Sequence, residues 1–324
     1  MKTLNKIAIG MLVAATSAFS GNASSADFPS RTIRIIVPVS AGGWGDVTTR
    51  VFAQKLGEVL GQSVLVDNRT GAGGLVGIRY TKEQPADGYT LMSTGSTISI
   101  QEALNKEPGF DALKDFTLVG SFARSPALVV AGAKSNYKSF SDLVADAKAH
   151  PGQISYGSAG IGTTTHIAAA MMLKQANLQM QHVPYKGNGA AMPDVIAGRV
   201  SFMIDAYGSS AAGLHGGLLK ALAVTSDSRL PVLADVPTTA QQGLPGFTYY
   251  YWLGLFAPAG TPPDVIKKLN DAMAKVLSDP TLKAKLEAQG TEPFYKTTAD
   301  SASFLKKDLT DNQNMIKTMG IPKQ

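Results

Sequence analysis

The stretch IRIIVPVSAGGWGDVTTRVFAQKL, from Ile33 to Leu56, passes from an apolar strand through a glycine-rich turn into a helix. Branched residues at its start favour a buried strand, and the apolar residues after the turn repeat at helical spacing, which predicts a helix over about Val47 to Leu60. A strand that continues through glycines directly into a helix leaves backbone N–H groups free at the helix N-terminus. The stretch therefore predicts a β-turn-α unit whose turn binds an anion.

Strands and helices alternate along the chain after this unit. The strand SVLVDN, the loop RTGAGG, a helix from about Leu75 and the strand YTLMSTG complete a βαβαβ series. A second series runs from ALVVAGA through the helix SFSDLVADAKAH, capped by Ser139 or Ser141, to the strand RVSFMID. Alternation of this kind predicts an α/β protein with two lobes, built on a mostly parallel sheet that helices cover on both faces.

The segment SYGSAGIGTTTHIAAAMML, from Ser155 to Leu173, places a second turn of the same kind in the second lobe. A strand end meets three glycines, then the hydroxyls of Thr163, Thr164 and Thr165, and then a helix. Open α/β sheets bind ligands at the carboxyl ends of their strands, so we expect both turns to face one site. Neither turn contains arginine or lysine, and neutral hydrogen-bond donors would therefore hold the anion.

The first turn also comes close to a dinucleotide-binding fingerprint. Gly43 and Gly45 match its first glycines, and Asp67 follows the next strand, where the ribose-binding acid is expected. However, Thr48 replaces the third glycine, and Asp46 places a negative charge at the pyrophosphate position. We therefore interpret the turn as a site for a small anion, and we expect no cofactor.

The first residues indicate export. Lys2 and Lys6 precede a short apolar run, Ile7 to Phe19, and small residues follow up to Ala26. We predict a signal peptide over residues 1–26 with cleavage after Ala26, and a protein that is periplasmic and soluble after cleavage. The chain has no cysteine, which excludes a lipid anchor on an N-terminal cysteine, disulfide bonds and thiolate metal ligands.

The composition is that of a folded globular protein: 324 residues, of which 44% are hydrophobic and 17% charged. The formal net charge falls from +6 to +4 when the two lysines of the leader are removed. Basic residues are scattered along the sequence, without the clustered, aromatic-interleaved patches of nucleic-acid binders. No second apolar segment approaches the roughly 20 residues that span a bilayer. We expect a monomer that binds no nucleic acid.

Many ordered motifs resemble one known family. They are FPSRTIRIIVPVSAGGWGD, LGQSVLVDNRTGAGGLVG, ADGYTLM, YGSAGIGTTTH, HVPYKGNGAAMPDVIAGRVSFM, LKALAVTS and LFAPAGTPPDVIKKLN. In these motifs the chain is similar to the Bug-type extracytoplasmic solute receptors of tripartite tricarboxylate transporters. The resemblance implies a two-lobed, type II clamshell periplasmic-binding-protein fold with a ligand cleft between the lobes. It implies lobe 1 at 27–124 and 230–324, lobe 2 at 125–229, a small carboxylate ligand, and delivery of that ligand to membrane permease subunits.

Carried over by position, the resemblance places the ligand site at the two turns and at two further strand ends. The marked positions are Ser40, Ala41, Gly42, Gly43, Trp44 and Asp46 in the first turn, Ser93, Ser96 and Thr97 after a first-lobe strand, Ser158, Gly160, Gly162, Thr163, Thr164 and His166 in the second turn, and Asp205 across the cleft. The chain departs from the family at Trp44, where small residues or proline are usual, and at Thr48 and Thr49. Ligand size and polarity stay open: a di- or tricarboxylate, or an aromatic acid such as terephthalate that stacks on Trp44.

Several of these residues have a structural alternative. Asp46 can cap its helix, the threonines of the second turn can cap the next one, and Trp44 can pack at the lobe interface. His166 is expected to hold its loop through a hydrogen bond. The four histidines are far apart in sequence and lack metal-ligand spacing, so we expect no metal site. Lys186 is expected to be a solvated or permease-facing charge.

An exported hydrolase of a small ester or amide is the alternative function. It would use Ser40 or Ser158 as the nucleophile and one of the four histidines as the base. The sequence has no G-x-S-x-G nucleophile elbow, and neither turn pairs a nucleophile with an evident base. We therefore expect a binding protein without catalytic residues.

Overall fold

A computed structural model describes residues 28–321 and 323–324 of the chain. The predicted signal peptide, residues 1–26, lies outside the described residues. The chain divides into Met1–Ser30 and a compact unit, Arg31–Gln324, which contains every helix and strand named below. Within the described residues, no helix is long and apolar enough to cross a membrane.

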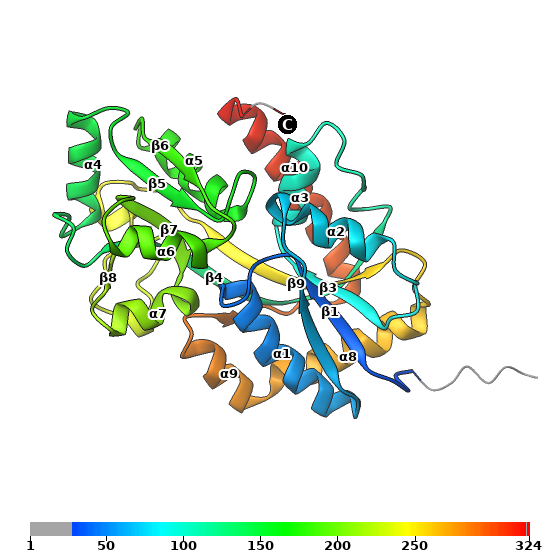
Figure 1. Cartoon of the computed structure of the whole chain (residues 1–324). Coiled ribbons are helices and arrows are strands. Elements are labelled where there is room, and N and C mark those ends of the chain that lie inside the picture. The colour runs from blue at the N-terminus through cyan, green and yellow to red at the C-terminus, as the bar shows by residue number, and fades with distance from the viewer. Residues whose placement is uncertain (1–27, 322) are drawn as a thin grey trace, which may run out of the picture. The chain divides into compact units, whose positions relative to one another are not determined.

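The elements of the compact unit follow one another along the chain as Figure 1 labels them. The strands are β1 (Ile33–Val37), β2 (Val64–Asn68), β3 (Thr90–Thr94), β4 (Phe116–Gly132), β5 (Ser155–Ser158), β6 (Gln181–Pro184), β7 (Phe202–Ala206), β8 (Leu219–Val224), β9 (Tyr250–Pro258) and β10 (Glu292–Pro293). The helices are α1 (Trp44–Leu60), α2 (Leu75–Lys82), α3 (Thr97–Leu104), α4 (Phe140–Ala149), α5 (Thr164–Gln175), α6 (Asn188–Ile196), α7 (Tyr207–His215), α8 (Pro263–Ser278), α9 (Pro280–Glu287) and α10 (Thr298–Met319).

The opening stretch forms the predicted β-turn-α unit. β1 lies between β2 and β3 and pairs with both in parallel. α1 begins at Trp44 instead of near Val47, because Gly43 already has the extended backbone of an N-cap, with φ −74° and ψ 162°. The helix ends at Gly61, whose left-handed conformation, φ 68°, favours glycine. The turn between β1 and α1 is therefore short, and it leads directly into the helix N-terminus.

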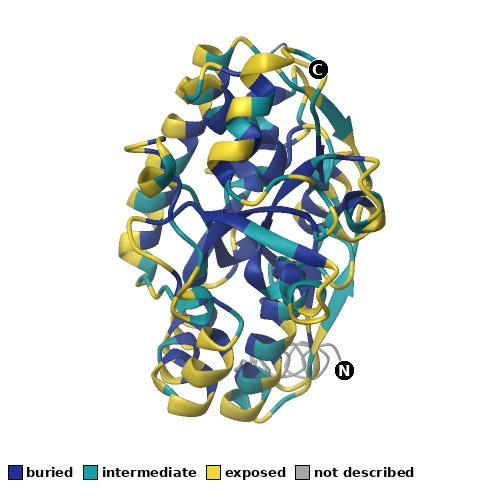
Figure 2. Cartoon of the chain, turned by 90° about the vertical axis from the view of Figure 1, so that its left-hand side faces the viewer, coloured by how far each residue is buried: buried dark blue, intermediate teal, exposed yellow. Residues whose placement is uncertain are grey.

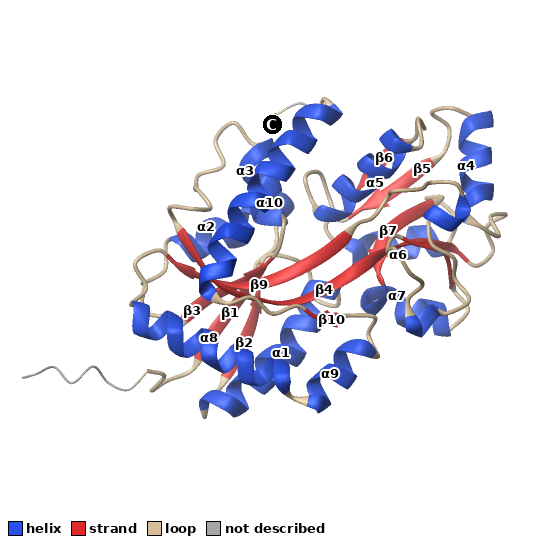
Figure 3. Cartoon of the chain, turned by 180° about the vertical axis from the view of Figure 1, so that it is seen from behind, coloured by secondary structure: helices blue, strands red, loops and turns tan. Residues whose placement is uncertain are grey.

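Two long strands connect the two halves of the sheet. β4 pairs antiparallel with β9 along its first part and with β7 and β8 along its last part, and β9 pairs antiparallel with β3. The strand order is β2-β1-β3-β9-β4-β7-β5-β6, with β8 and β10 also paired to β4 (Figure 3). The prediction of a mostly parallel sheet is wrong for these central strands. β4 and β9 run back across the sheet, and the parallel pairs are those around β1 and β5.

The second half of the sheet repeats the α/β pattern. β5 pairs in parallel with β6 and β7. Ser139 is the N-cap of α4: its hydroxyl accepts a hydrogen bond from the N–H of Asp142, and the Asp142 carboxylate accepts one from the N–H of Ser139. α6 begins at Asn188 behind the N-cap Gly187. The helices of this half thus start from short, well-defined turns at the ends of its strands.

The core follows the sheet, and the helices expose their outer faces (Figure 2). One buried cluster joins the first strands to β9 and α10 through Ile36, Met92, Phe256 and Leu309. A second cluster packs β4, β7 and β8 against α6 and α7. Full burial of each large apolar side chain contributes about 1.5–3 kcal/mol, so these clusters hold the strand ends in place.

Candidate functional site

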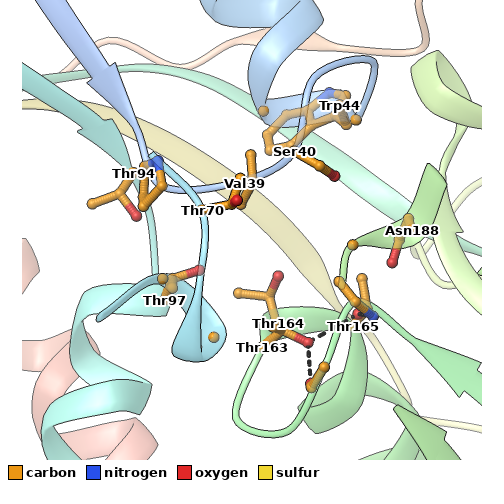
Figure 4. Close-up of a pocket in the computed structure, with 18 of the residues that line it drawn as sticks. Val39, Ser40, Trp44, Thr70, Thr94, Thr97, Thr163, Thr164, Thr165 and Asn188 are labelled. Atoms are coloured by element: carbon orange, nitrogen blue, oxygen red, sulfur yellow. Dashed lines mark hydrogen bonds between the residues drawn. The ribbon is translucent and has the colours of Figure 1, made fainter. Parts of the chain in front are cut away.

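A cavity of about 440 Å³ lies where the carboxyl ends of β1, β3, β5 and β7 meet. Loops after these strands, the RTGAGG loop before α2 and the first part of β9 form its wall. Figure 4 shows Ser40 and Trp44 above the cavity, Thr97 to one side, Asn188 to the other, and the second turn with Thr164 below. The two predicted turns therefore do face one site, and the site has a size typical of small-molecule pockets.

Six of the described helices present their N-termini to this cavity. Each contributes its N-cap or its first residue to the wall: Gly43 of α1, Gly74 of α2, Thr97 of α3, Thr163 of α5, Gly187 of α6 and Ala206 of α7. A helix N-terminus carries about half a positive charge and free N–H donors. The cavity therefore attracts anions without relying on cationic side chains.

Lys186 lies at the rim of the cavity. Its side chain is exposed, and among the lining residues it is the only lysine or arginine. The residue is thus solvated, as its place in the sequence indicated, but it also contributes to the wall. A cation at an exposed rim is largely screened by water and salt, so it adds less to binding than a buried donor does.

Asp46 fixes the first turn from the inside. Its carboxylate accepts hydrogen bonds from the Gly42 N–H at 3.0 Å, the Arg50 guanidinium at 2.9 Å and the Asn68 amide at 2.9 Å. Burial raises the pKa of Asp46, but the hydrogen bonds from Arg50, Gly42 and Asn68 outweigh burial and lower the pKa overall. Asp46 does not line the cavity, and it is not the cap of α1 either, because Gly43 is the N-cap and has no side-chain cap bond; Asp46 instead holds the turn.

Trp44 is packed against its neighbours and also lines the cavity. Its indole Nε1 donates to the Thr291 hydroxyl at 2.9 Å, and its ring lies 5.9 Å from that of Tyr251. A Cβ atom on Gly208 of α7 would lie 3.3 Å from the indole. Only 9% of Trp44 is exposed, yet it lines the cavity. The indole is therefore a fixed part of the wall.

The three threonines of the second turn have different roles. The Thr163 hydroxyl donates to the Gly160 carbonyl at 2.7 Å and accepts from the N–H of His166 as the cap of α5. The Thr165 hydroxyl accepts from the N–H of Ala159 at 2.9 Å. Across residues 28–321 and 323–324, the half-buried Thr164 hydroxyl has no partner, and it lines the cavity. Thr164 is thus the hydroxyl of this turn that is free to bind a ligand.

His166 lies behind the turn, where it accepts a hydrogen bond from the N–H of Gly162 through Nδ1 at 3.2 Å. Its ring stacks on that of His182, with centroids 4.1 Å apart, and His182 Nε2 lies 2.6 Å from the Ser158 hydroxyl. Burial lowers the pKa of both histidines, and His166 lowers that of His182 further, to about 4. This cluster could not be predicted from the sequence, because its members come from different elements.

Two serines at the end of β3 have different positions: Ser93 lines the cavity, and Ser96 does not. Ser93 lines the cavity, with its hydroxyl 2.7 Å from that of Thr49, one of the residues that depart from the family. Ser96 points away: its hydroxyl donates to Asp308 of α10 at 2.7 Å and accepts from the Trp252 indole at 2.7 Å. Ser96 therefore joins α3 to α10.

The structure brings part of the predicted set together. The cavity wall contains Ser40, Gly43, Trp44, Ser93, Thr97, Gly160, Thr163, Thr164 and Asp205. Outside the wall lie Ala41, Gly42, Asp46, Ser96, Ser158, Gly162 and His166. Lining residues that the sequence analysis did not mark include Thr70, Gly71, Ala72, Gly73, Gly74, Thr94, Thr165, Tyr185, Gly187, Asn188, Tyr251 and Leu253. The glycine-rich motifs RTGAGG and YKGNG, each ahead of a helix, were the signals available for two of these groups.

The walls approach each other closely at two places. Gln101 Nε2 donates to the Gly73 carbonyl at 3.1 Å and to the Gly162 carbonyl at 2.9 Å, so one amide joins two glycine loops. A Cβ atom on Gly187, where φ is +117°, would lie 2.1 Å from the Ser40 hydroxyl, and only glycine fits there. Among the described residues, no group of three or more histidines, aspartates or glutamates is arranged to hold a metal ion.

Comparisons with known proteins agree on one family. The model of the tripartite tricarboxylate transporter family receptor matches residues 48–321. The UPF0065 protein in the tcbD-tcbE intergenic region of Pseudomonas sp. strain P51 is 36% identical, over 97% of this chain and 93% of that protein. The periplasmic binding protein BugD superposes with a TM-score of 0.87 at 29% identity, over 92% of this chain and all of that one. The structure of R. palustris Rpa4515 with adipate superposes with a TM-score of 0.88 at 32% identity, over 91% of this chain and 99% of that one.

Proposed function

Because the chain belongs to the tripartite tricarboxylate transporter receptor family, we propose that it is a periplasmic receptor that binds a small organic carboxylate and delivers it to membrane permease subunits. The predicted family and the predicted α/β periplasmic-binding-protein fold are confirmed. Members of this family are binding proteins and not enzymes. The predicted leader over residues 1–26 supports the periplasmic assignment.

The observation that carries the proposal is the set of six helix N-termini around a cavity whose buried wall lacks cationic side chains. Each N-terminus favours an anion by about 0.3–1 kcal/mol near a surface and by more when partly buried. Hydrogen bonds to a charged oxygen contribute about 1.5–3 kcal/mol each. Together they offset the cost of removing one carboxylate from water.

The geometry does not favour the hydrolase alternative. Ser158 and His182 do form a close serine–histidine pair, but Ser158 is fully buried and lies outside the cavity wall. A nucleophile must reach the substrate, and this hydroxyl cannot. Ser40 lines the cavity, but its contacts within the described residues include no histidine. The serine–histidine pair thus fixes the second turn.

The ligand class is limited by the size of the cavity and by Trp44. About 440 Å³ accommodates aliphatic di- and tricarboxylates and single-ring aromatic acids such as terephthalate. Adipate is bound in the structure of Rpa4515.

We propose further that residues 125–229 move as one lobe against 27–124 and 230–324, and that a monomer performs the function.

A thermal-shift screen tests the proposal. The panel contains succinate, adipate, citrate and terephthalate, with 1,4-butanediol and 1,6-hexanediol as neutral controls. A ligand present at about 100 times its dissociation constant adds around 2.7 kcal/mol of stability, which a melting experiment detects. We expect at least one carboxylate to stabilise the protein and the diols to have no effect. Absence of any shift with all carboxylates, or equal shifts with the diols, would disprove the function.

A further inference from the structure

One end of the cavity holds a buried carboxyl group of the protein, whose pKa burial raises more than its hydrogen bonds lower it. Asp205, at the end of β7, is 1% exposed and lines the cavity. Its carboxylate accepts hydrogen bonds from Asn188 Nδ2 at 2.6 Å, from Ser209 Oγ at 2.6 Å and from Ser210 Oγ at 2.7 Å. These donors are neutral, and across the described chain Asp205 forms no ion pair with a lysine, arginine or histidine. Side chains of α6 and α7 therefore hold this carboxyl group beside the N-termini of the two helices.

The carboxylate of Asp205 fixes the orientation of the Asn188 amide. A carboxylate only accepts hydrogen bonds, so the NH2 group of the amide must face it and the amide oxygen must face elsewhere. Within residues 28–321 and 323–324, Asn188 Oδ1 has no hydrogen-bond partner. Asn188 lies at the edge of the cavity, between the loop of Ser40 and the second turn (Figure 4). An acceptor without a partner thus stands at this end of the cavity.

A second unpaired group comes from β9. The Tyr251 hydroxyl also has no partner among the described residues, although only 6% of Tyr251 is exposed and the residue lines the cavity. Burial raises the pKa of Tyr251, so its hydroxyl keeps its proton and can donate as well as accept a hydrogen bond. Buried polar groups are almost always paired, so two unpaired ones at one end of a cavity indicate a missing ligand group.

The three groups together determine what this end of the cavity accepts. A second ionised carboxylate would face the accepting oxygens of Asp205 and Asn188, neither of which offers it a hydrogen. A hydroxyl, amide or ammonium group would instead donate to Asn188 Oδ1 and pair with the Tyr251 hydroxyl. Lys186, at the exposed rim, is screened by solvent and does not reverse this preference.

We propose that Asn188, Asp205 and Tyr251 form a subsite for a hydrogen-bond donor, so that the receptor takes a carboxylate whose far end carries a hydroxyl, amide or ammonium group. This inference rests on the proposed function, because the carboxylate itself binds at the other end. There the N-terminus of α5 and the free Thr164 hydroxyl face the cavity, and α5 has no acidic residue in its first turn. The ligand therefore lies with its anion toward α5 and its donor toward α6.

Calorimetric titration with matched ligands tests the subsite. The probes are succinate, 4-hydroxybutanoate, succinamate and 4-aminobutanoate, and the six-carbon set of adipate, 6-hydroxyhexanoate, adipamate and 6-aminohexanoate. Each set keeps one carboxylate and one chain length and changes only the far group. We expect at least one donor-ended probe to bind ten times more tightly than the dicarboxylate of the same length. Comparison of the two amino acids with the hydroxy acids and amides shows whether the preferred donor is charged.

Two variants locate the preference in the protein. Tyr251→Phe removes the unpaired hydroxyl and keeps the ring, and Asp205→Asn replaces one accepting oxygen by an NH2 group at nearly constant size. We expect each to reduce the preference for the donor-ended probe at least threefold. Thr164→Val, at the opposite end, is the matched control and should weaken all probes alike. If Asp205→Asn fails to fold, Tyr251→Phe alone decides, because it removes no partner of any other group.

The outcomes separate the inference from the proposed function. Dicarboxylates that bind as tightly as the donor-ended probes would overturn the subsite and leave the receptor function intact. A donor preference that survives in both variants would overturn the subsite as well. The same holds if other carboxylates bind to the protein but none of the eight probes does. Failure of every carboxylate, in these titrations and in the thermal-shift screen, would disprove the proposed function itself.

Discussion

Replacement of Thr164 by valine should weaken ligand binding and leave the fold unchanged. The Thr164 hydroxyl has no partner among the described residues, so its removal breaks no internal hydrogen bond. Valine has the same branched shape and keeps the contacts of the methyl group. If the hydroxyl donates to a ligand carboxylate, its loss costs about 1.5–3 kcal/mol, which corresponds to a roughly 10- to 150-fold weaker affinity.

Thr163→Val is the matched comparison, because the neighbouring hydroxyl is committed to the fold. It donates to the Gly160 carbonyl and caps α5 through the N–H of His166. Loss of an N-cap costs about 0.5–2 kcal/mol of stability. Thr163→Val should therefore lower the free energy of unfolding by about that amount, whereas Thr164→Val should change it by less than about 0.5 kcal/mol.

The assay combines calorimetric affinity for the best carboxylate of the screen with urea unfolding of both variants and of the unmodified protein. The expected pattern is a large loss of affinity without loss of stability for Thr164→Val, and a loss of stability for Thr163→Val. Unchanged affinity in Thr164→Val would refute the reasoning. So would a loss of stability in Thr164→Val as large as that in Thr163→Val, since the hydroxyl would then have an internal role.

Three other predictions concern the wall, the histidine pair and the lobes. Trp44→Ala should weaken terephthalate by up to about tenfold more than succinate, and Trp44→Phe should restore part of the difference by stacking; equal losses for both ligands would make Trp44 a packing residue only. Burial and His166 lower the pKa of His182 to about 4, so the unfolded chain binds more protons than the folded one between pH 6.5 and 4, and stability should fall as the pH falls through this range. His182→Phe should flatten this decline in urea unfolding. An identical decline in the variant would contradict the prediction. Ligand binding should close the two proposed lobes and reduce the radius of gyration in small-angle scattering, and an unchanged radius at saturating ligand would argue against a hinge.

The two glycine-rich turns were predictable because the decisive signals are local. In each, an apolar strand, glycines and the start of a helix follow one another directly, and the structure brings both turns to one cavity. The central strands were not predictable in the same way. β4 is a 17-residue strand whose pairing partners, β7, β8 and β9, all come much later in the sequence, so its antiparallel direction depends on the tertiary fold.

The roles of individual polar residues depend on contacts that sequence spacing does not encode. Nothing in the run of three threonines distinguishes Thr164, which is free, from Thr163, which returns to the Gly160 carbonyl. Ser96 resembles Ser93 in sequence context, but Asp308 of α10 engages its hydroxyl. Tyr251 reads as one aromatic residue of a core strand, and only the pairing of β9 with β3 and β4 brings it to the cavity.

The bond network of Gln101 has a consequence for how long a ligand stays bound. Both hydrogens of its amide are engaged, one by the Gly73 carbonyl and one by the Gly162 carbonyl, and the amide oxygen accepts from Asn105 Nδ2, which fixes the group in place. The two glycine loops can separate only when one of these bonds breaks, so entry and exit of a ligand between them share this step. Removal of the amide would thus speed association and dissociation together, and residence time would change more than affinity.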